Sequence, residues 1–244
     1  MHLLVSVATV DDALAAREGG ADLIDAKNPH AGALGAVSGE ALRAIHAAVA
    51  GARPVTAALG EAATEAAVEG AARQASAAGT SFVKVGFAGV DSPTRVASLT
   101  EAAVRGARAG GHADVVAVAY ADADGSSLRP DVLVTAAADG GARGILMDTS
   151  NKQGPGLRHL LDRAALTAWI AQAHAAGLFA AVAGKLALDD LAFVQSCGAD
   201  IAGVRGAACL GGRWGSVSAK KVRQLRSALL LCSGRAWLTV LGAR

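Results

Sequence analysis

A short pattern occurs four times in this chain of 244 residues, and it limits the folds that the chain can adopt. In each copy a glycine is followed within three residues by a run that is mostly apolar but carries charged residues at its end. The copies are GGADLIDAK (19–27), AGTSFVKVGF (78–87), GGARGILMD (140–148) and CGADIAGVR (197–205). Such repetition indicates that one structural unit is used several times.

The spacing of the copies predicts how many units there are. Their anchor glycines lie 59, 62 and 57 residues apart, about twice the thirty or so residues of one strand–helix–strand step. We therefore expect a further strand between each pair of copies and one before the first. Apolar, strand-like segments stand at these places: HLLVSV (2–7), PVTAAL (54–59), DVVAVAY (114–120) and LFAAVA (178–183).

The segments between the eight predicted strands are rich in alanine and show helical periodicity. Most begin with Asp, Ser or Glu and end at Gly, as helices do at their caps. Eight alternating strands and helices within about 250 residues predict an α/β fold, a single (β/α)8 TIM barrel. An open doubly wound sheet would normally carry a Gly-rich nucleotide motif after its first strand, where this chain has SVATVDDA. We expect the barrel over 1–228 and an extension of unknown structure over 229–244.

Composition argues against several classes of protein. A net charge of +2 gives no reason to expect nucleic acid, and the basic run at 220–226 has the spacing of a solvated helix face. Three separated cysteines without a CxxC pair favour a reduced, cytoplasmic setting, as does the lack of a signal-peptide pattern.

Polar residues interrupt the apolar stretch 164–183, so we interpret it as a helix, a Gly cap and a buried strand and expect no membrane span. The Ala-rich helices and apolar tail leave surface for a homo-oligomer.

Strand periodicity sorts the residues of the four copies between the two faces of the barrel wall. Positions four and six after the glycine are apolar in every copy, which predicts that they face the helices. Positions five and seven therefore face the barrel interior, and they carry charges. The inward set is Asp25, Lys27, Lys84, Gly86, Leu146, Asp148, Gly203 and Arg205.

Buried charges in a barrel interior favour a catalytic role over a structural one. Lys27, Asp148 and Arg205 are expected at one level near the C-terminal mouth, with Asp25 and Lys84 one level deeper and Lys152 nearby. Ion pairs that merely fill the interior are the alternative, but burying them costs more than the usual Val, Leu and Ile layers.

The chemistry expected of this cluster is that of an amine. A lysine attacks a carbonyl only when neutral, and burial beside a second ammonium lowers its pKa. Carboxylates can orient the lysines and relay protons. The six histidines form no metal-binding motif, so we expect neither a metal nor a cofactor.

Two loops at the same mouth point to a phosphorylated substrate. AGKLAL (183–188) and RGAACLGG (205–212) follow the seventh and eighth predicted strands, where many barrels bind phosphate. We expect phosphate contacts from Gly184, Lys185, Arg205, Gly206 and Ala207 through backbone N–H groups and cationic side chains. The alternative is that the glycines of these loops only allow ordinary turns and bind no phosphate.

These motifs, in their order, resemble one family. LLVSV, GGADLIDAKNPHAGALGA, FVKVGF, GILMDTSNKQGPGLRHLL, AGKL and ADIAGVRGAAC are similar to segments of (5-formylfuran-3-yl)methyl phosphate synthases, which make a furan precursor of methanofuran-type cofactors. The resemblance extends from residue 3 to about 228. It implies a carbon–oxygen lyase that condenses two molecules of glyceraldehyde 3-phosphate without a metal, by a mechanism like that of class I aldolases.

The resemblance also implies roles for residues, which periodicity alone does not assign. Lys27 would form the Schiff base and Lys84 would transfer protons, assisted by Asp25, Asp148 and Lys152. Two alternatives stay open at this stage: another Schiff-base aldolase acting on a sugar phosphate, and a non-catalytic sugar-phosphate-binding barrel whose buried charges are structural.

Overall fold

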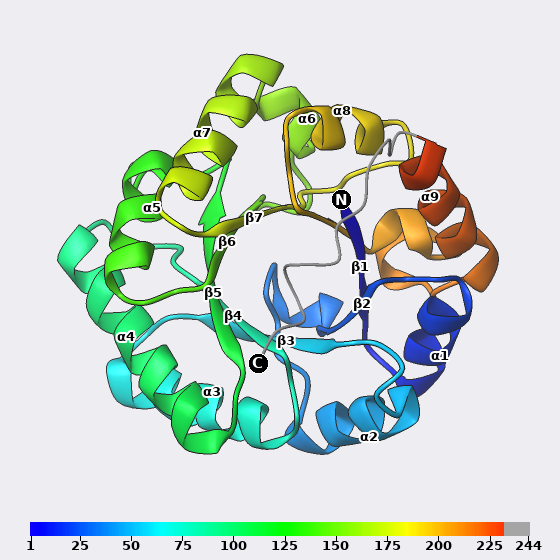
Figure 1. The fold of residues 1–244 in the computed structure, drawn as a ribbon, viewed down its shortest axis with the longest axis horizontal. Coiled ribbons are helices and arrows are strands. Elements are labelled where there is room, and N and C mark those ends of the chain that lie inside the picture. Colours follow the sequence, from blue (N-terminus) through cyan, green and yellow to red (C-terminus); the bar gives the residue numbers. More distant parts are fainter. Residues whose placement is uncertain (232–244) are drawn as a thin grey trace.

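The computed structural model describes residues 1–231, and these form a closed barrel of eight parallel strands surrounded by helices (Figure 1). Each strand pairs with the next along the chain, and the last pairs with the first. The predicted TIM barrel is confirmed. The strands are β1 (His2–Val7), β2 (Leu23–Ala26), β3 (Val55–Glu61), β4 (Phe82–Gly86), β5 (Asp114–Tyr120), β6 (Gly144–Asp148), β7 (Phe179–Val182) and β8 (Ile201–Val204).

The helices lie between the strands and cover the outside of the barrel. They are α1 (Val10–Glu18), α2 (Gly39–Val49), α3 (Glu65–Ala77), α4 (Pro93–Gly110), α5 (Pro130–Asp139), the short α6 (Leu157–Leu160), α7 (Arg163–Ala175), α8 (Asp190–Ser196) and α9 (Ala219–Leu231). Three single 3-10 turns add to these, η1 (Pro29–Ala31), η2 (Gly206–Ala208) and η3 (Gly212–Trp214). The stretch 164–183 contains a helix, a Gly turn and a strand, as predicted. No helix within residues 1–231 is both long and apolar enough to cross a membrane.

The anchor glycines of the repeat share one backbone conformation. Gly20, Gly79, Gly141 and Gly198 have φ values of 87°, 90°, 82° and 95°, in the left-handed region that other residues adopt only with strain. Each lies between the end of a helix and the start of the next strand. The repeat therefore marks the turn that feeds the chain from the outer layer back into the barrel.

The two faces of the strands divide as the repeat predicts. All eight apolar residues at the outward positions, such as Ile24, Val83 and Met147, pack in the cluster between strands and helices. The residues at the inward positions line the interior cavity, with Gly86 as the exception. A side chain there would meet the carboxylate of Glu61, which occupies that space instead.

Helix α9 lies at the end of the described part of the chain and continues to Leu231, three residues past the predicted boundary at 228. Its residues Val222, Leu225 and Leu229 are buried in the apolar layer. The boundary itself stays a prediction. The rest of the predicted extension lies outside the described residues.

An apolar plug closes the lower part of the barrel. The rings of Phe82 and Phe179 lie 5.2 Å apart inside it, together with Leu4, Leu146 and Ile201. Aromatics make up only 3% of the sequence, so these two phenylalanines fill a volume that the many alanines cannot. Phe179 fits because Gly144 has no side chain: a Cβ on Gly144 would lie 2.4 Å from the ring.

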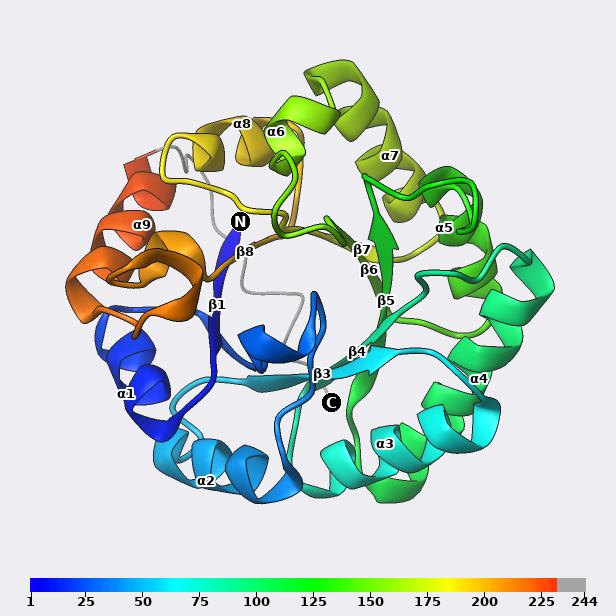
Figure 2. The same cartoon turned by 180° about the vertical axis from the view of Figure 1, so that it is seen from behind.

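The loop after β2 folds inward and lies across the centre of the barrel (Figure 2). Leu34 in this loop is buried in the interior apolar cluster. The turn is compact because Gly35 approaches the carbonyl oxygen of Asn28 too closely for any side chain, and its own carbonyl accepts from the Asn28 N–H at 2.8 Å. The loop therefore covers part of the mouth immediately after Lys27.

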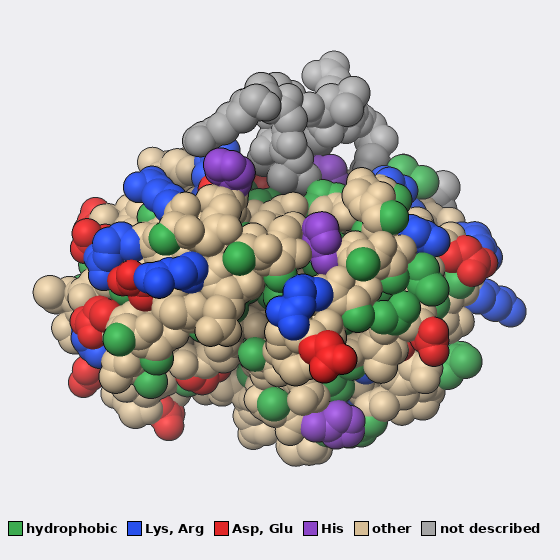
Figure 3. Space-filling view, turned by 90° about the horizontal axis from the view of Figure 1, so that it is seen from below, with side chains coloured by type: hydrophobic (Ala, Val, Ile, Leu, Met, Phe, Trp, Pro, Cys, Tyr) green, Lys and Arg blue, Asp and Glu red, His purple; other side chains and the backbone are tan. Residues whose placement is uncertain are grey.

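Basic and acidic side chains are interspersed on the face of the molecule shown in Figure 3 rather than gathered by sign. Ion pairs at the surface of the molecule include Arg73 with Glu69 and Arg129 with Asp131. Pairs of this kind contribute little to stability because solvent screens them. The expectation that the chain has no nucleic-acid partner stays a prediction.

Gly144→Ala should destabilise the barrel because the added methyl group collides with the ring of Phe179. Overpacking of this kind lowers the free energy of unfolding by about 1–3 kcal/mol, measured by urea denaturation. Adding Phe179→Leu should recover part of the loss, since the smaller side chain leaves room for the methyl group. An unchanged midpoint in Gly144→Ala would contradict this account of the plug.

Candidate active site

A cavity of about 320 Å³ opens at the C-terminal mouth of the barrel, above the phenylalanine plug. All ten residues predicted for the site line it, from the loops and ends of β2, β4, β6, β7 and β8. Its floor is apolar and its upper wall is charged, with six Lys or Arg side chains and two Asp side chains. The structure thus brings together residues that lie up to 182 positions apart in the sequence, from Asp25 to Ala207.

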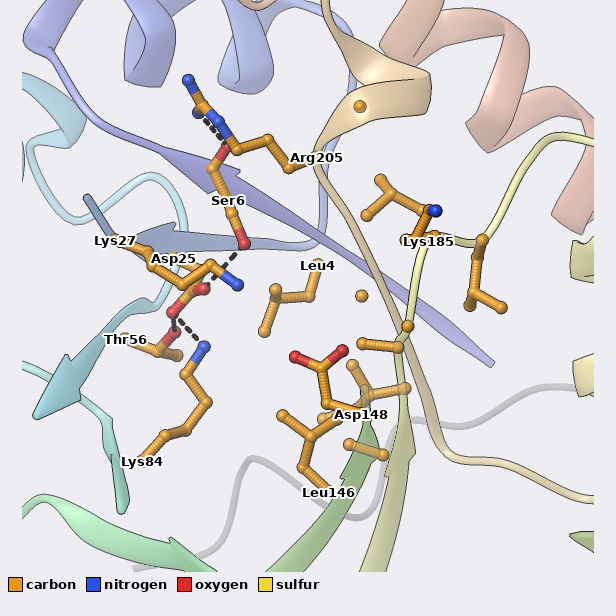
Figure 4. Close-up of a pocket in the computed structure, with 18 of the residues that line it drawn as sticks. Leu4, Ser6, Asp25, Lys27, Thr56, Lys84, Leu146, Asp148, Lys185 and Arg205 are labelled. Carbon is orange, nitrogen blue, oxygen red and sulfur yellow. Dashed lines mark hydrogen bonds and ion pairs between the residues drawn. The ribbon is translucent and has the colours of Figure 1, made fainter. Parts of the chain in front are cut away.

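Asp25 is fully buried and accepts from three side chains (Figure 4). Its Oδ1 lies 2.5 Å from Nζ of Lys84 and accepts from the hydroxyl of Thr56 at 2.7 Å, while Oδ2 accepts from the hydroxyl of Ser6 at 2.9 Å. Burial alone raises the pKa of Asp25, but the ammonium groups of Lys84 and Lys27 and these hydrogen bonds outweigh it and hold the pKa below its usual value. Asp25 is therefore an anion whose main partner is Lys84.

Asp148 forms a second pair of the same kind at the end of β6. Its Oδ1 accepts from Nζ of Lys152 at 2.7 Å and from the backbone N–H of Thr149 at 2.8 Å. Nζ of Lys152 also donates to the carbonyl and hydroxyl oxygens of Thr149. Burial raises the pKa of Asp148, but Lys152 and Lys27 lower it by more, so the net shift is downward. Asp148 is likewise an anion.

Lys27 is the lysine left without a direct partner in this cluster. Within residues 1–231 its Nζ makes no hydrogen bond or ion pair, although the side chain is only 7% exposed. Figure 4 shows it reaching into the cavity with no interaction drawn from its nitrogen. Burial lowers the pKa of Lys27 from 10.5 to about 8, with Asp148 and Asp25 opposing the shift and Lys84 and Lys152 adding to it. A lysine in this state is neutral often enough to act as a nucleophile near neutral pH.

Arg205 lines the cavity, but all three nitrogens of its guanidinium bind other groups of the protein, which leaves little of it for the predicted phosphate contact. Nη1 donates to the carbonyl oxygen of Ser6 at 3.0 Å and pairs with the buried carboxylate of Asp12 at 3.3 Å. Nε and Nη2 donate to the carbonyl oxygens of Arg213 and Gly215. The side chain bends away from Lys27 and Asp148 in Figure 4. The cause is Asp12 at the start of α1, which strand periodicity does not place near Arg205.

The loop after β7 has an unusual backbone. Gly184 and Lys185 both have positive φ values, 98° and 61°, and a side chain on Gly184 would press on Leu157 and Thr149. Strain of this kind in a non-glycine residue is typical of functional sites. The side chain of Lys185 is exposed, and its Nζ donates to the carbonyl oxygen of Gly154 at 2.5 Å, joining the loops after β6 and β7.

Four residues of the site are absent from the sequence prediction. Ser6 and Thr56 hold Asp25, Asp12 holds Arg205, and Arg213 lines the cavity. Strand periodicity signals the first two, because each pairs in register with Asp25 and is a polar residue within an apolar strand. Asp12 and Arg213 lie on a helix and a loop, where that rule does not apply.

Within residues 1–231 no three His, Cys, Asp or Glu side chains come together as a metal site.

Comparison with known proteins identifies the family. The family model described as 4-HFC-P synthase matches residues 3–226. The chain belongs to this family. It is 34% identical over 233 residues to the (5-formylfuran-3-yl)methyl phosphate synthase of Methanothermobacter thermautotrophicus, a match that covers 94% of this chain and 99% of the relative. It is 37% identical to the synthase of the same name from Methanopyrus kandleri, over 93% and 98% of the two chains.

Solved structures support the same fold for this member of the 4-HFC-P synthase family. The 3-hexulose-6-phosphate synthase of Salmonella typhimurium superposes with a TM-score of 0.68 at 18% identity, covering 96% of this chain and all of the other. Phosphoribosyl anthranilate isomerase from Thermus thermophilus gives 0.67 at 19% identity, with the same coverage. At these identities the likeness shows the barrel fold alone. The names of the sequence relatives indicate that the chain is a synthase.

Two lysines of the cavity, Lys27 and Lys84, should respond oppositely to replacement by methionine. Lys27→Met removes an amine whose folded-state pKa lies below its unfolded value, so protonating it costs the folded state free energy below pH 8. The free energy of unfolding at pH 7 should therefore rise by about 3 kcal/mol. The gain should shrink as pH rises from about 8 toward 10.5, where the unfolded chain also loses this proton.

Lys84→Met is the matched comparison, since both substitutions remove one buried ammonium. It leaves the carboxylate of Asp25 buried without its main partner, and the free energy of unfolding should fall by about 3–5 kcal/mol. Urea denaturation at pH 7 and pH 9.5 measures both. Equal losses in the two variants would show that Lys27 is as firmly paired as Lys84.

Proposed function

We propose that this chain condenses two molecules of glyceraldehyde 3-phosphate into (5-formylfuran-3-yl)methyl phosphate, with loss of one phosphate and of water, through a Schiff base on Lys27. The observation that carries the proposal is the state of Lys27: a buried amine with a lowered pKa, unpaired, at the centre of a cationic cavity. Family membership supports the product, because relatives over nearly their whole length carry this name.

The first step is attack of the neutral Lys27 amine on the aldehyde carbon of one substrate. The carbinolamine then loses water, which requires a proton for the departing hydroxyl. The Lys84–Asp25 pair lies beside Lys27 and supplies a proton donor whose position is fixed by the hydroxyls of Ser6 and Thr56. Lys84 is therefore the proton-transferring partner in this proposal, and Asp25 orients it.

The imine makes loss of phosphate easier. It acidifies the hydrogen on C2 of the bound triose, and once that proton has left, the electron pair forms the C2–C3 double bond as phosphate leaves C3. The charge of the leaving phosphate is stabilised by cations at the mouth, among which Lys152 is held by Asp148. Phosphate contacts from Lys185 and from the backbone of Gly184, Gly206 and Ala207 belong to this proposal. Joining to the second triose and further loss of water complete the furan.

Reductive trapping tests the covalent step. Incubation with glyceraldehyde 3-phosphate and cyanoborohydride should leave a stable adduct on Lys27, located by peptide mass spectrometry, and parallel runs without reductant should show the absorbance of a furan aldehyde. Lys27→Met is the control, because it removes the amine that should carry the adduct. An adduct without any furan would favour a simpler Schiff-base aldolase, and an absence of adducts would favour a non-catalytic binder.

The trapping rate should follow the pKa of Lys27. The neutral fraction of an amine with a pKa of about 8 rises about tenfold per pH unit below that value and levels off above it. We expect the initial trapping rate, normalised to a small-molecule amine to correct for the reductant, to level off near pH 8. A rate that still climbs tenfold per unit at pH 9 would mean that the reacting amine has an ordinary lysine pKa.

A further inference from the structure

Arg213 is a cationic side chain of the cavity with donors that the protein does not use. It lies in η3, between β8 and α9, and is half-buried. Its Nη2 donates to the carbonyl oxygens of Pro29 and Gly32 in the loop after β2, at 3.3 and 2.9 Å. Within residues 1–231, Nε is buried without a hydrogen-bond partner and Nη1 has none either. A guanidinium with unused donors at the edge of a cavity is suited to bind an anion.

The position of Arg213 is fixed from several sides. Nε of Arg205 donates to its carbonyl oxygen at 2.9 Å, and Arg205 is itself held by the buried carboxylate of Asp12. The next residue, Trp214, stacks on the ring of His30 at 4.9 Å. The guanidinium is thus preorganised at the mouth, so little conformational freedom is lost when a ligand binds.

The charge balance of the cavity points to the same kind of ligand. Six cationic side chains line it, of which Lys84 and Lys152 pair with the two lining aspartates and Arg205 pairs with Asp12. The other three, Lys27, Lys185 and Arg213, have no acidic partner among residues 1–231. A cavity with this excess of positive charge attracts a doubly charged anion such as a phosphate monoester. Gly206, one of the expected backbone contacts to phosphate, lies against the backbone of Arg213: a Cβ on Gly206 would be 3.5 Å from the backbone nitrogen of Arg213. Arg213 and the expected backbone contacts therefore belong to the same part of the cavity wall.

We propose that Arg213 binds the phosphate of the aldehyde that reacts at Lys27 and makes the enzyme select phosphorylated over unphosphorylated aldehydes. Arg205, which the sequence suggested for this contact, is the residue that positions Arg213. The inference rests on the proposed function for the identity of the reacting aldehyde, whereas the binding of phosphate itself does not depend on it.

The test compares two aldehydes in three proteins: the wild type, Arg213→Gln, and Leu210→Ala as the control, which changes an exposed residue of the same loop outside the cavity and keeps the guanidinium. Reductive trapping gives the half-saturating concentrations of glyceraldehyde 3-phosphate and of unphosphorylated glyceraldehyde. Arg213→Gln should raise the value for the phosphorylated aldehyde at least tenfold and leave the other within about twofold. Leu210→Ala should leave the ratio of the two values near that of the wild type.

Calorimetric titration with inorganic phosphate separates this inference from the proposed function. If no protein is trapped by either aldehyde, the Schiff-base proposal fails, but weaker phosphate binding by Arg213→Gln than by Leu210→Ala still supports the anion contact. Equal losses for both aldehydes in Arg213→Gln, or a loss of selectivity as large in Leu210→Ala, would overturn the inference and leave Arg213 a role in holding the loop. Unchanged phosphate binding in Arg213→Gln would overturn it as well.

Discussion

The ion pair between Lys84 and Asp25 is the interaction on which the rest of the site depends. A carboxylate that is fully buried requires a cation and hydrogen bonds, and Lys84, Thr56 and Ser6 supply them from three other strands. Since Lys84 is committed to Asp25 and Lys152 to Asp148, Lys27 has no carboxylate of its own. Burial is the main cause of its lowered pKa, and the ammonium groups of Lys84 and Lys152 add to the shift.

The barrel supplies the rigidity that this arrangement needs. Its outer layer of alanines and branched residues holds the strands in register, and the phenylalanine plug closes the interior beneath the charges. The left-handed glycines of the repeat let each helix return to the barrel through a tight turn, so that Asp25, Lys84, Asp148 and Arg205 all arrive at the same mouth. Buried charges are tolerated there because the surrounding layers contribute the stability that the charges cost.

The sequence was sufficient to predict the barrel and most of the site, for a physical reason. Inward and outward positions alternate along a strand, so the repeat alone identified Asp25, Lys27, Lys84 and Asp148 as facing inward. The same rule does not apply to loops and helices. Asp12 lies on a helix and pairs with Arg205, and Arg213 lies in a loop and lines the cavity. Both positions depend on how segments distant in sequence pack together. Nor does periodicity distinguish Lys27 from Lys84, since that difference lies in which lysine contacts Asp25.

The central claim is that Lys27 is the one amine of this cluster available in neutral form, and competitive labelling tests it most directly. A trace of acetic anhydride, applied across a range of pH and followed by peptide mass spectrometry, reports the titration of each lysine in the intact protein. The account predicts that Lys27 is acetylated before Lys84 and Lys152, with a half-rise near pH 8. Preferential labelling of Lys84 or Lys152, or a half-rise for Lys27 near the ordinary lysine pKa of about 10.4, would contradict it.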